Sequence, residues 1–115
     1  MPNSSRNREP LTPAVFHVLA SLAEGPLHGY GIMKRVEEDS GMEMGPGTVY
    51  GSLQRLEEVG WVIAAEVEKQ DTRRGKHFVL TEAGRQALEA EALRLTRLAR
   101  MAVERGLVPE GGMAS

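Results

Sequence analysis

Apolar and polar positions alternate with two different periods along the chain, and the changes of period divide it into regions. From residue 11 to residue 59, apolar side chains recur every three to four residues, as in helices with one buried face. Between residues 61 and 67 the spacing falls to two, which indicates a strand. After residue 81 the helical period returns. The pattern therefore predicts three helices, a short β region and a final long helix.

The first two predicted helices are short and follow each other closely. The first begins at Thr12, whose hydroxyl can cap a helix, and Pro13 suits the first helical position. Its apolar face is wide, so it should be buried on more than one side, and it ends before Pro26. We expect the second helix over residues 27–41. Short breaks between successive helices are typical of a helix-turn-helix arrangement.

The third predicted helix lies within residues 45–60 and has two different faces. Val49, Leu53 and Leu56 recur at helical spacing and should face a core. The opposite face carries small and hydrogen-bonding residues, which suit the floor of a DNA major groove. We interpret this segment as a recognition helix. Its outward face is expected to hold Thr48, Gly51, Ser52 and Arg55, with Tyr50 and Gln54 at the flanks.

Two short strands joined by a basic turn follow the third helix. The strands are predicted at residues 61–67 and 76–80, and the residues between them favour a tight turn. The turn gathers Arg73, Arg74 and Lys76 near its tip. A hairpin after the third helix is the wing of a winged helix-turn-helix, where it contacts the DNA backbone or minor groove. An ordinary solvated hairpin turn is the alternative interpretation.

The final predicted helix, residues 81–106, is too long to bury its apolar side on a domain of this size. Thr81 can cap it, and Glu82 interacts favourably with the positive end of the helix dipole. The surplus apolar stripe should pack against a second copy of the chain, as a helical dimer interface. The expected interface residues are Leu88, Ala92, Leu95, Leu98, Ala99 and Ala102.

The predicted fold class is α+β and mostly helical: a winged helix-turn-helix with a long C-terminal dimerisation helix. The first ten residues are polar and irregular, which favours a disordered tail. The alternative interpretation is a basic arm in which Arg6 and Arg8 touch phosphates. The expected division is a flexible N-terminal arm (1–10), a winged helix-turn-helix DNA-binding domain (11–80), the dimerisation helix (81–106) and a flexible tail (107–115).

Composition narrows the functional classes. The chain has no cysteine, which excludes disulfides and thiolate metal sites. His17, His28 and His77 lack a metal-ligand spacing, and no nucleophile or phosphate-loop signature appears, so we expect no enzyme activity, metal or cofactor. Neither a membrane span nor a secretory signal is present, so we expect a cytoplasmic location away from membranes. The net charge of −2 supports the alternative of a protein-interaction module without DNA binding.

Three motifs occur in one order along the chain: LHGYGIMKRVEE at 27–38, GTVYGSLQRLEEVGWV at 47–62 and RRGKHFVLTEAGR at 73–85. In this order and spacing they resemble the PadR-like family of transcriptional regulators, in its short form with a single C-terminal helix. The resemblance implies a homodimeric repressor that binds a pseudo-palindromic operator in double-stranded DNA. It also implies release of the DNA by a small effector, often an aromatic or hydrophobic compound.

The resemblance also implies roles for particular residues. Tyr50 has two interpretations, because it can pack beside Leu53 or donate its hydroxyl to a phosphate. Some relatives stack aromatic ligands on a tryptophan of the dimer helix, but the last helix here has no aromatic residue, so the effector is not identified. The implied DNA-binding residues are Thr48, Tyr50, Ser52 and Arg55 on the recognition helix, Arg73, Arg74 and Lys76 on the wing, and His28 and Tyr30 in a partly structural HGY element.

Overall fold

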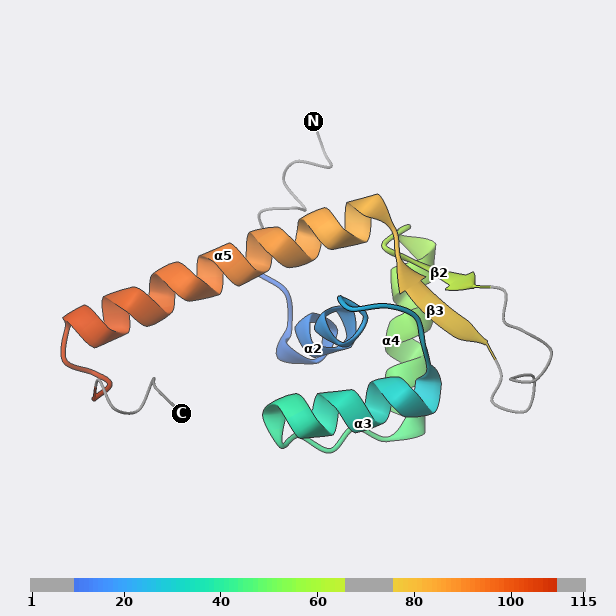
Figure 1. Cartoon of the computed structure of the whole chain (residues 1–115), viewed down its shortest axis with the longest axis horizontal. Coiled ribbons are helices and arrows are strands. Elements are labelled where there is room, and N and C mark those ends of the chain that lie inside the picture. Colours follow the sequence, from blue (N-terminus) through green and yellow to red (C-terminus); the bar gives the residue numbers. More distant parts are fainter. Residues whose placement is uncertain (1–9, 66–75, 110–115) are drawn as a thin grey trace.

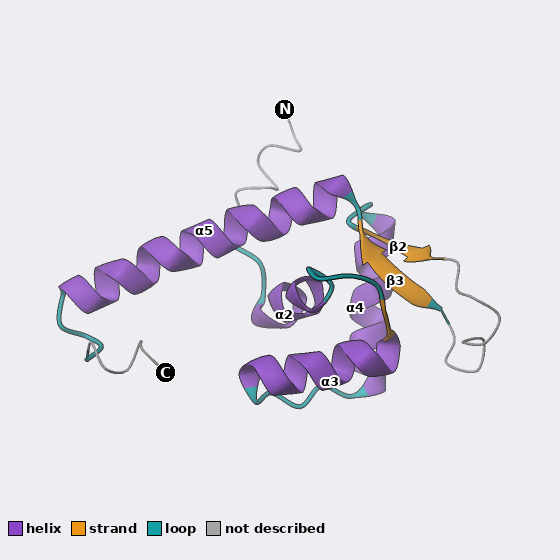
Figure 2. Cartoon of the chain, in the orientation of Figure 1, coloured by secondary structure: helices purple, strands orange, loops and turns teal. Residues whose placement is uncertain are grey.

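The computed structural model describes residues 10–65 and 76–109, which are coloured in Figures 1 and 2. The predictions for most of the N-terminal arm, for Arg73 and Arg74, and for the end of the tail lie outside the described residues. In chain order the elements are α2 (Pro13–Ser21), β1 (Leu27–His28), α3 (Gly29–Ser40), α4 (Pro46–Glu58), β2 (Val62–Ala65), β3 (His77–Leu80) and α5 (Glu82–Glu104).

Three helix boundaries lie where their capping residues predict: the starts of α2 and α5 and the end of α4. Thr12 Oγ1 accepts a hydrogen bond from the Val15 N–H at 3.2 Å, which satisfies one of the unpaired donors at the start of α2. Thr81 Oγ1 accepts one from the Gly84 N–H at 3.0 Å at the start of α5. After α4, Gly60 adopts the left-handed conformation with a φ of 82°. The predicted starts of the first and last helices are confirmed.

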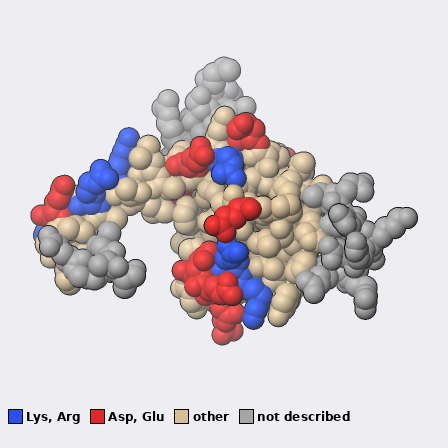
Figure 3. All heavy atoms as spheres, in the orientation of Figure 1, with Lys and Arg blue, Asp and Glu red and all other residues tan. Residues whose placement is uncertain are grey.

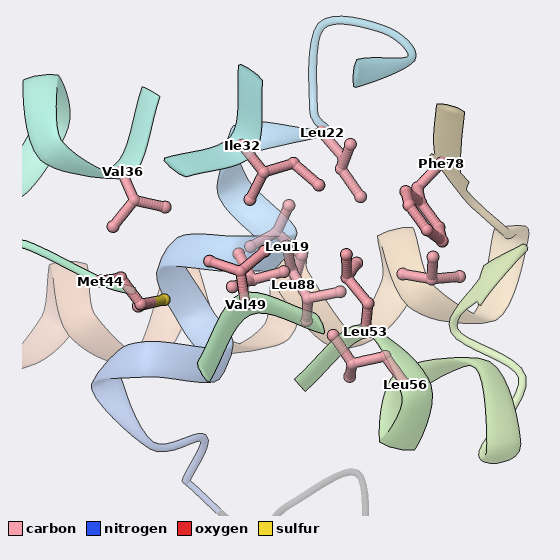
Figure 4. Close-up of a cluster of buried hydrophobic side chains, with 12 residues drawn as sticks. Leu19, Leu22, Ile32, Val36, Met44, Val49, Leu53, Leu56, Phe78 and Leu88 are labelled. Carbon is pink, nitrogen blue, oxygen red and sulfur yellow. The ribbon is translucent and has the colours of Figure 1, made fainter. Parts of the chain in front are cut away.

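Side chains from every layer of the fold meet in one apolar core. Figure 4 shows that these side chains come from α2, α3, α4, β3 and α5 and point into a common space. Burial of an aliphatic side chain of this size contributes about 1.5–3 kcal/mol relative to exposure. The central members, all essentially without solvent contact, are Val18, Leu19, Ile32, Val36, Val49, Leu53 and Val62.

The described strands form a three-stranded antiparallel sheet in the order β1-β3-β2. Strands β2 and β3 are the predicted hairpin, with Val62 opposite Leu80. The periodicity predicts Leu27 and His28 inside the second helix, and this prediction is wrong. Their backbone is extended and pairs with β3, with His28 opposite His77, so the helix starts at Gly29. The start of α3 is thereby tied to β3 of the hairpin.

Helix α5 is attached to the domain through its first turns and extends beyond it, as Figure 1 shows. At Gly84 the helix backbone lies so close to Trp61 that an added Cβ would be 2.0 Å from the Trp61 carbonyl oxygen. Leu88 is 7% exposed and belongs to the core of its own protomer. The predicted dimer contact at Leu88 is therefore corrected, because α5 packs against α2 in this region and leaves that side chain unavailable to a second copy.

A buried carboxylate fixes α5 to the beginning of the domain. The Glu91 side chain is 5% exposed, and Arg94 donates two hydrogen bonds to it, one of them 2.9 Å long from Nε. The backbone at Leu11 also contributes to the lowered pKa of this carboxylate. The Arg94 hydrogen bonds are the main reason that the pKa of Glu91 is lowered, although burial opposes them. Glu91 is thus held in the middle of α5 by Arg94, close to the segment that leads into α2.

We expect Glu91→Gln to lower the free energy of unfolding by about 1–2 kcal/mol at pH 7, because a charge-assisted hydrogen-bonded pair is lost. Since the pKa of Glu91 is lowered in the folded state, its stabilisation is present above the unfolded pKa and disappears as the pH falls through the folded value. Denaturant unfolding at pH 7 and pH 3 should show the difference shrinking in acid. The exposed Glu89→Gln is the control and should change stability by less than about 0.5 kcal/mol. Equal losses for the two variants would contradict this role.

Candidate nucleic-acid interface

Helix α4 presents a narrow polar face to solvent while its other face is held in the core. Val49, Leu53 and Leu56 are buried, as their spacing predicts. On the opposite side Thr48 and Arg55 are exposed, also as predicted. Because the apolar stripe fixes the rotation of the helix, the outward side chains have a defined direction. This arrangement suits a helix that enters the major groove with its polar face toward the base edges.

Ser52 does not lie on this outward face. It is only 2% exposed and belongs to the buried stripe of α4. The reason is its spacing, because Ser52 lies three residues after Val49 and four before Leu56. The expected base contact at Ser52 is therefore corrected: its hydroxyl cannot reach a groove while α4 stays packed.

The sequence predicts Gln54 at a flank of the recognition face, and the structure leaves it exposed beside Arg55. It follows Gly51 by three residues, so these two positions are neighbours on one side of the helix. An amide side chain can pair bidentately with adenine, as a guanidinium pairs with guanine. The helical spacing of residues 49–56 already indicates in the sequence that Ser52 is buried and that Gln54 is exposed.

The start of α3 lies beside α4 and is capped by a histidine. His28 Nδ1 accepts a hydrogen bond of 2.9 Å from the Gly31 N–H, so the ring carries its proton on the other nitrogen when it is neutral. Its ring also meets His77 of β3 edge to face, with 5.3 Å between ring centroids. His28 is thus a structural part of the HGY element, which positions the next two residues.

Tyr50 packs across the gap between the two helices. A Cβ built on Gly29 would lie 2.2 Å from the Tyr50 hydroxyl oxygen, so the phenol ring end occupies space that only glycine leaves open. Tyr50 is nevertheless 49% exposed. The end of the ring therefore lies against the start of α3 while about half of the residue stays exposed, and a contact of the hydroxyl with phosphate stays a prediction.

Polar and aromatic groups from three segments converge at the start of α3. Tyr30 is 62% exposed on its first turn. Lys76 is exposed and precedes His77, whose pairing with His28 places Lys76 next to the junction of β1 and α3. Together with Tyr50 these residues form a surface with two hydroxyls and one ammonium, which are common donors to DNA phosphates. Arg73 and Arg74 lie outside the described residues and cannot be placed on it.

The opposite end of α3 is acidic, as the face in Figure 3 shows. Its last turns carry Glu37, Glu38 and Asp39. On the same helix, Arg35 Nη1 donates a hydrogen bond of 3.1 Å to Glu24 Oε1, and this hydrogen bond raises the pKa of Arg35. Charge is therefore distributed unevenly along α3, and the acidic end is unsuited to phosphate contact.

The described residues contain no cluster of three or more side chains suited to hold a metal ion. Within the same residues, no helix combines the length and apolar character that crossing a membrane requires.

Comparison with known proteins adds independent information. A family model described as the transcriptional regulator PadR-like family matches residues 18–90. An uncharacterized 37.1 kDa protein in transposon TN4556 of Streptomyces fradiae is 47% identical over 81 residues, which cover 70% of this chain but only 22% of that protein. The transcriptional regulator Rv3488 of Mycobacterium tuberculosis is 33% identical over 84 residues, 73% of this chain and 77% of that protein.

Solved structures confirm the predicted fold class. A PadR family transcription regulator from Clostridium difficile has a TM-score of 0.71 at 23% identity, over 81% of this chain and 97% of that one. Bacillus subtilis PadR in complex with operator DNA has a TM-score of 0.60 at 24% identity, over 70% of this chain and 46% of that one. At these identities the likeness concerns the fold.

The Gly29–Tyr50 contact can be tested by adding a methyl group. In Gly29→Ala the new Cβ must displace the Tyr50 ring, which is free to swing outward because it is half exposed. We expect the protein to stay folded, with a change in unfolding free energy below about 1 kcal/mol, and the Tyr50 ring resonances to shift in NMR spectra. Gly47→Ala is the control, since a Cβ there meets no atom within 4 Å. Unmoved Tyr50 signals in Gly29→Ala would refute the contact.

Proposed function

The chain belongs to the PadR-like family of transcriptional regulators, and from this premise we propose that it is a homodimeric repressor that binds a specific DNA operator. Members of this family are transcriptional regulators, so the protein is not an enzyme. The observation that carries the proposal is the outward polar face of α4, held in one orientation by a buried stripe. The fold is shared with Bacillus subtilis PadR, which has been solved in complex with operator DNA.

The proposed contacts divide into those that read bases and those that position the protein. In the major groove, Arg55 would pair with guanine and Gln54 with adenine, while Thr48 can bond to either kind of base edge. Phosphates would be contacted by Tyr30, Tyr50 and Lys76 near the start of α3, and by Arg73 and Arg74 from the wing. His28 would act indirectly, by capping α3.

The proposed domain division follows the predicted one. Residues 11–80 would form the DNA-binding unit and residues 81–106 the dimerisation helix, and the predicted segments 1–10 and 107–115 lie largely outside the described residues. Beyond Glu91, α5 carries Leu95 and Leu98, which are 37% and 44% exposed and lie three residues apart, so they are neighbours on one face of the helix. Ala92, Ala99 and Ala102 complete the stripe proposed to meet a second copy. Two-fold symmetry would then match a pseudo-palindromic operator.

We further propose that a small hydrophobic effector releases the DNA, as the family resemblance implies. The main alternative is a winged helix used only for protein contacts. A gel-shift of the promoter region of its own gene separates the two, because a folded dimer that retards no DNA at low salt would favour the alternative.

Base reading can be separated from phosphate contact by substitution. Arg55→Ala and Gln54→Ala should each cost about 1–3 kcal/mol at one operator position and relax discrimination there. Lys76→Ala should weaken binding to all sequences alike and reduce the steepness of the salt dependence by about one. The control is Ser52→Ala, whose side chain is buried and should leave base preference unchanged. Binding to a library of operator variants measures both effects. A changed base preference in Ser52→Ala, with none in Arg55→Ala, would overturn the assignment.

The proposed dimer interface on α5 can be tested with two variants that change the net charge by the same amount. Leu95→Asp/Leu98→Asp should weaken self-association at least about 100-fold, because two side chains worth about 1.5–3 kcal/mol each leave the interface. Arg97→Asp changes the net charge by the same amount on a neighbouring exposed position and should remain dimeric. Sedimentation equilibrium measures the association, and circular dichroism confirms that the variants are folded. The proposal fails if the parent chain is a monomer at micromolar concentration or if both variants stay dimeric.

A further inference from the structure

A pocket of about 340 Å³ lies between α3 and the loop that leads into α4. Figure 1 shows this loop running beside α3 before the chain enters α4. Four of its lining residues are spaced as one face of α3, and the loop supplies the others. The volume is within the range of small-molecule sites, which begins at about 300 Å³. The side chains that define it are Tyr30, Met33, Lys34, Glu37, Glu43 and Met44.

The chemistry of the lining is that of a site for an apolar cation. Glu37 and Glu43 are exposed, and neither forms an ion pair with another described residue, so two carboxylates and one ammonium line this pocket. Met33 and Met44 supply flexible thioether side chains that adapt to irregular ligands. From these features we propose that the pocket binds an organic cation with an aromatic or bulky apolar body.

A second observation points to the same class of ligand. The Lys34 ammonium lies 6.0 Å from the centroid of the Tyr30 ring, over its face. This is the outer limit of a cation–π contact, and the ring is largely exposed, so the protein already holds a cation weakly at this position. A less hydrated organic cation would replace the ammonium on the ring and keep the two carboxylates as counter-charges.

The position of the pocket connects it to the proposed function, on which this part of the inference rests. Met44 is buried in the core and Gly45 is the N-cap residue of α4, so an occupant touches the chain directly before the recognition helix. It also covers Tyr30, which is proposed to contact a phosphate. Ligand and DNA would therefore weaken each other's binding, and by linkage the two effects must be equal. The organic cation would be the effector that releases the operator.

The test begins with the DNA-free, full-length protein, so that it does not depend on operator binding. Tetraphenylphosphonium is titrated while methyl NMR signals of labelled methionines are followed, and tetraphenylborate serves as a ligand of the same shape and opposite charge. Shifts at Met33 and Met44 with the cation, and at least about tenfold weaker binding of the anion, are expected. Met101 reports on α5. Shifts at Met101 with both ions, or none at Met33 and Met44, would overturn the site.

Variants then distinguish a direct contact of the Glu37 carboxylate with the cation from a general effect of net charge. Glu37→Gln should weaken cation binding about fivefold, the upper range for an exposed charge pair. The adjacent Glu38→Gln makes the same change in net charge outside the pocket and should bind as the parent does. Tyr30→Phe should retain binding and Tyr30→Ala should lose most of it. Equal losses in Glu37→Gln and Glu38→Gln would contradict a defined pocket.

The effector assignment has its own measurement. Tetraphenylphosphonium should release operator DNA from the parent protein, and Glu37→Gln should need about fivefold more of it for half release. Cation binding at Met33 and Met44 without any loss of DNA affinity would overturn the effector role. Absence of operator binding by the unliganded protein would instead contradict the proposed function, and the NMR titration would still decide the pocket.

Discussion

The buried stripe of α4 is the constraint on which the rest of the molecule depends. Val49, Leu53 and Leu56 lie in the core and together contribute several kcal/mol of burial energy, at about 1.5–3 kcal/mol for each side chain. This energy fixes the rotation of the helix about its own axis. A rotation of one residue, about 100°, would bring Ser52 outward and drive charged groups into the core, which costs far more than any single contact with DNA. The outward face is therefore a consequence of packing.

The same logic shows which features can be predicted from the sequence. Local signals at Thr12, Thr81 and Gly60 act within one helical turn, so the starts of α2 and α5 and the end of α4 follow from residue types alone. The alternation after Gly60 likewise predicts the hairpin. Ser52 is an exception. Its polar side chain suggests the outward face, but its spacing from Val49 and Leu56 places it on the buried stripe. A serine is small enough to be buried there at little cost in volume.

Features that depend on contacts between distant segments could not be predicted. The two residues of β1 have no period of their own, and their strand character comes from pairing with β3, some fifty positions later. Gly29 appears as a flexible residue in the sequence, but its role is to leave room for Tyr50. Leu88 shows the helical period of an interface, and only the packing of α5 against α2 assigns it to the protomer's core. Periodicity identifies a buried face without identifying what covers it.

Helix α3 connects the parts of the domain that a regulator must couple. Its start is paired with the sheet through β1, is capped by His28 and touches Tyr50 of α4. Its exposed face, beginning at Tyr30, lines the pocket beside the loop that enters α4. Because the core holds α3 through Ile32 and Val36, an occupant of the pocket cannot push this helix inward. The loop of residues 42–45 leads directly into the recognition helix, and within it only Met44 is buried while the other residues are exposed.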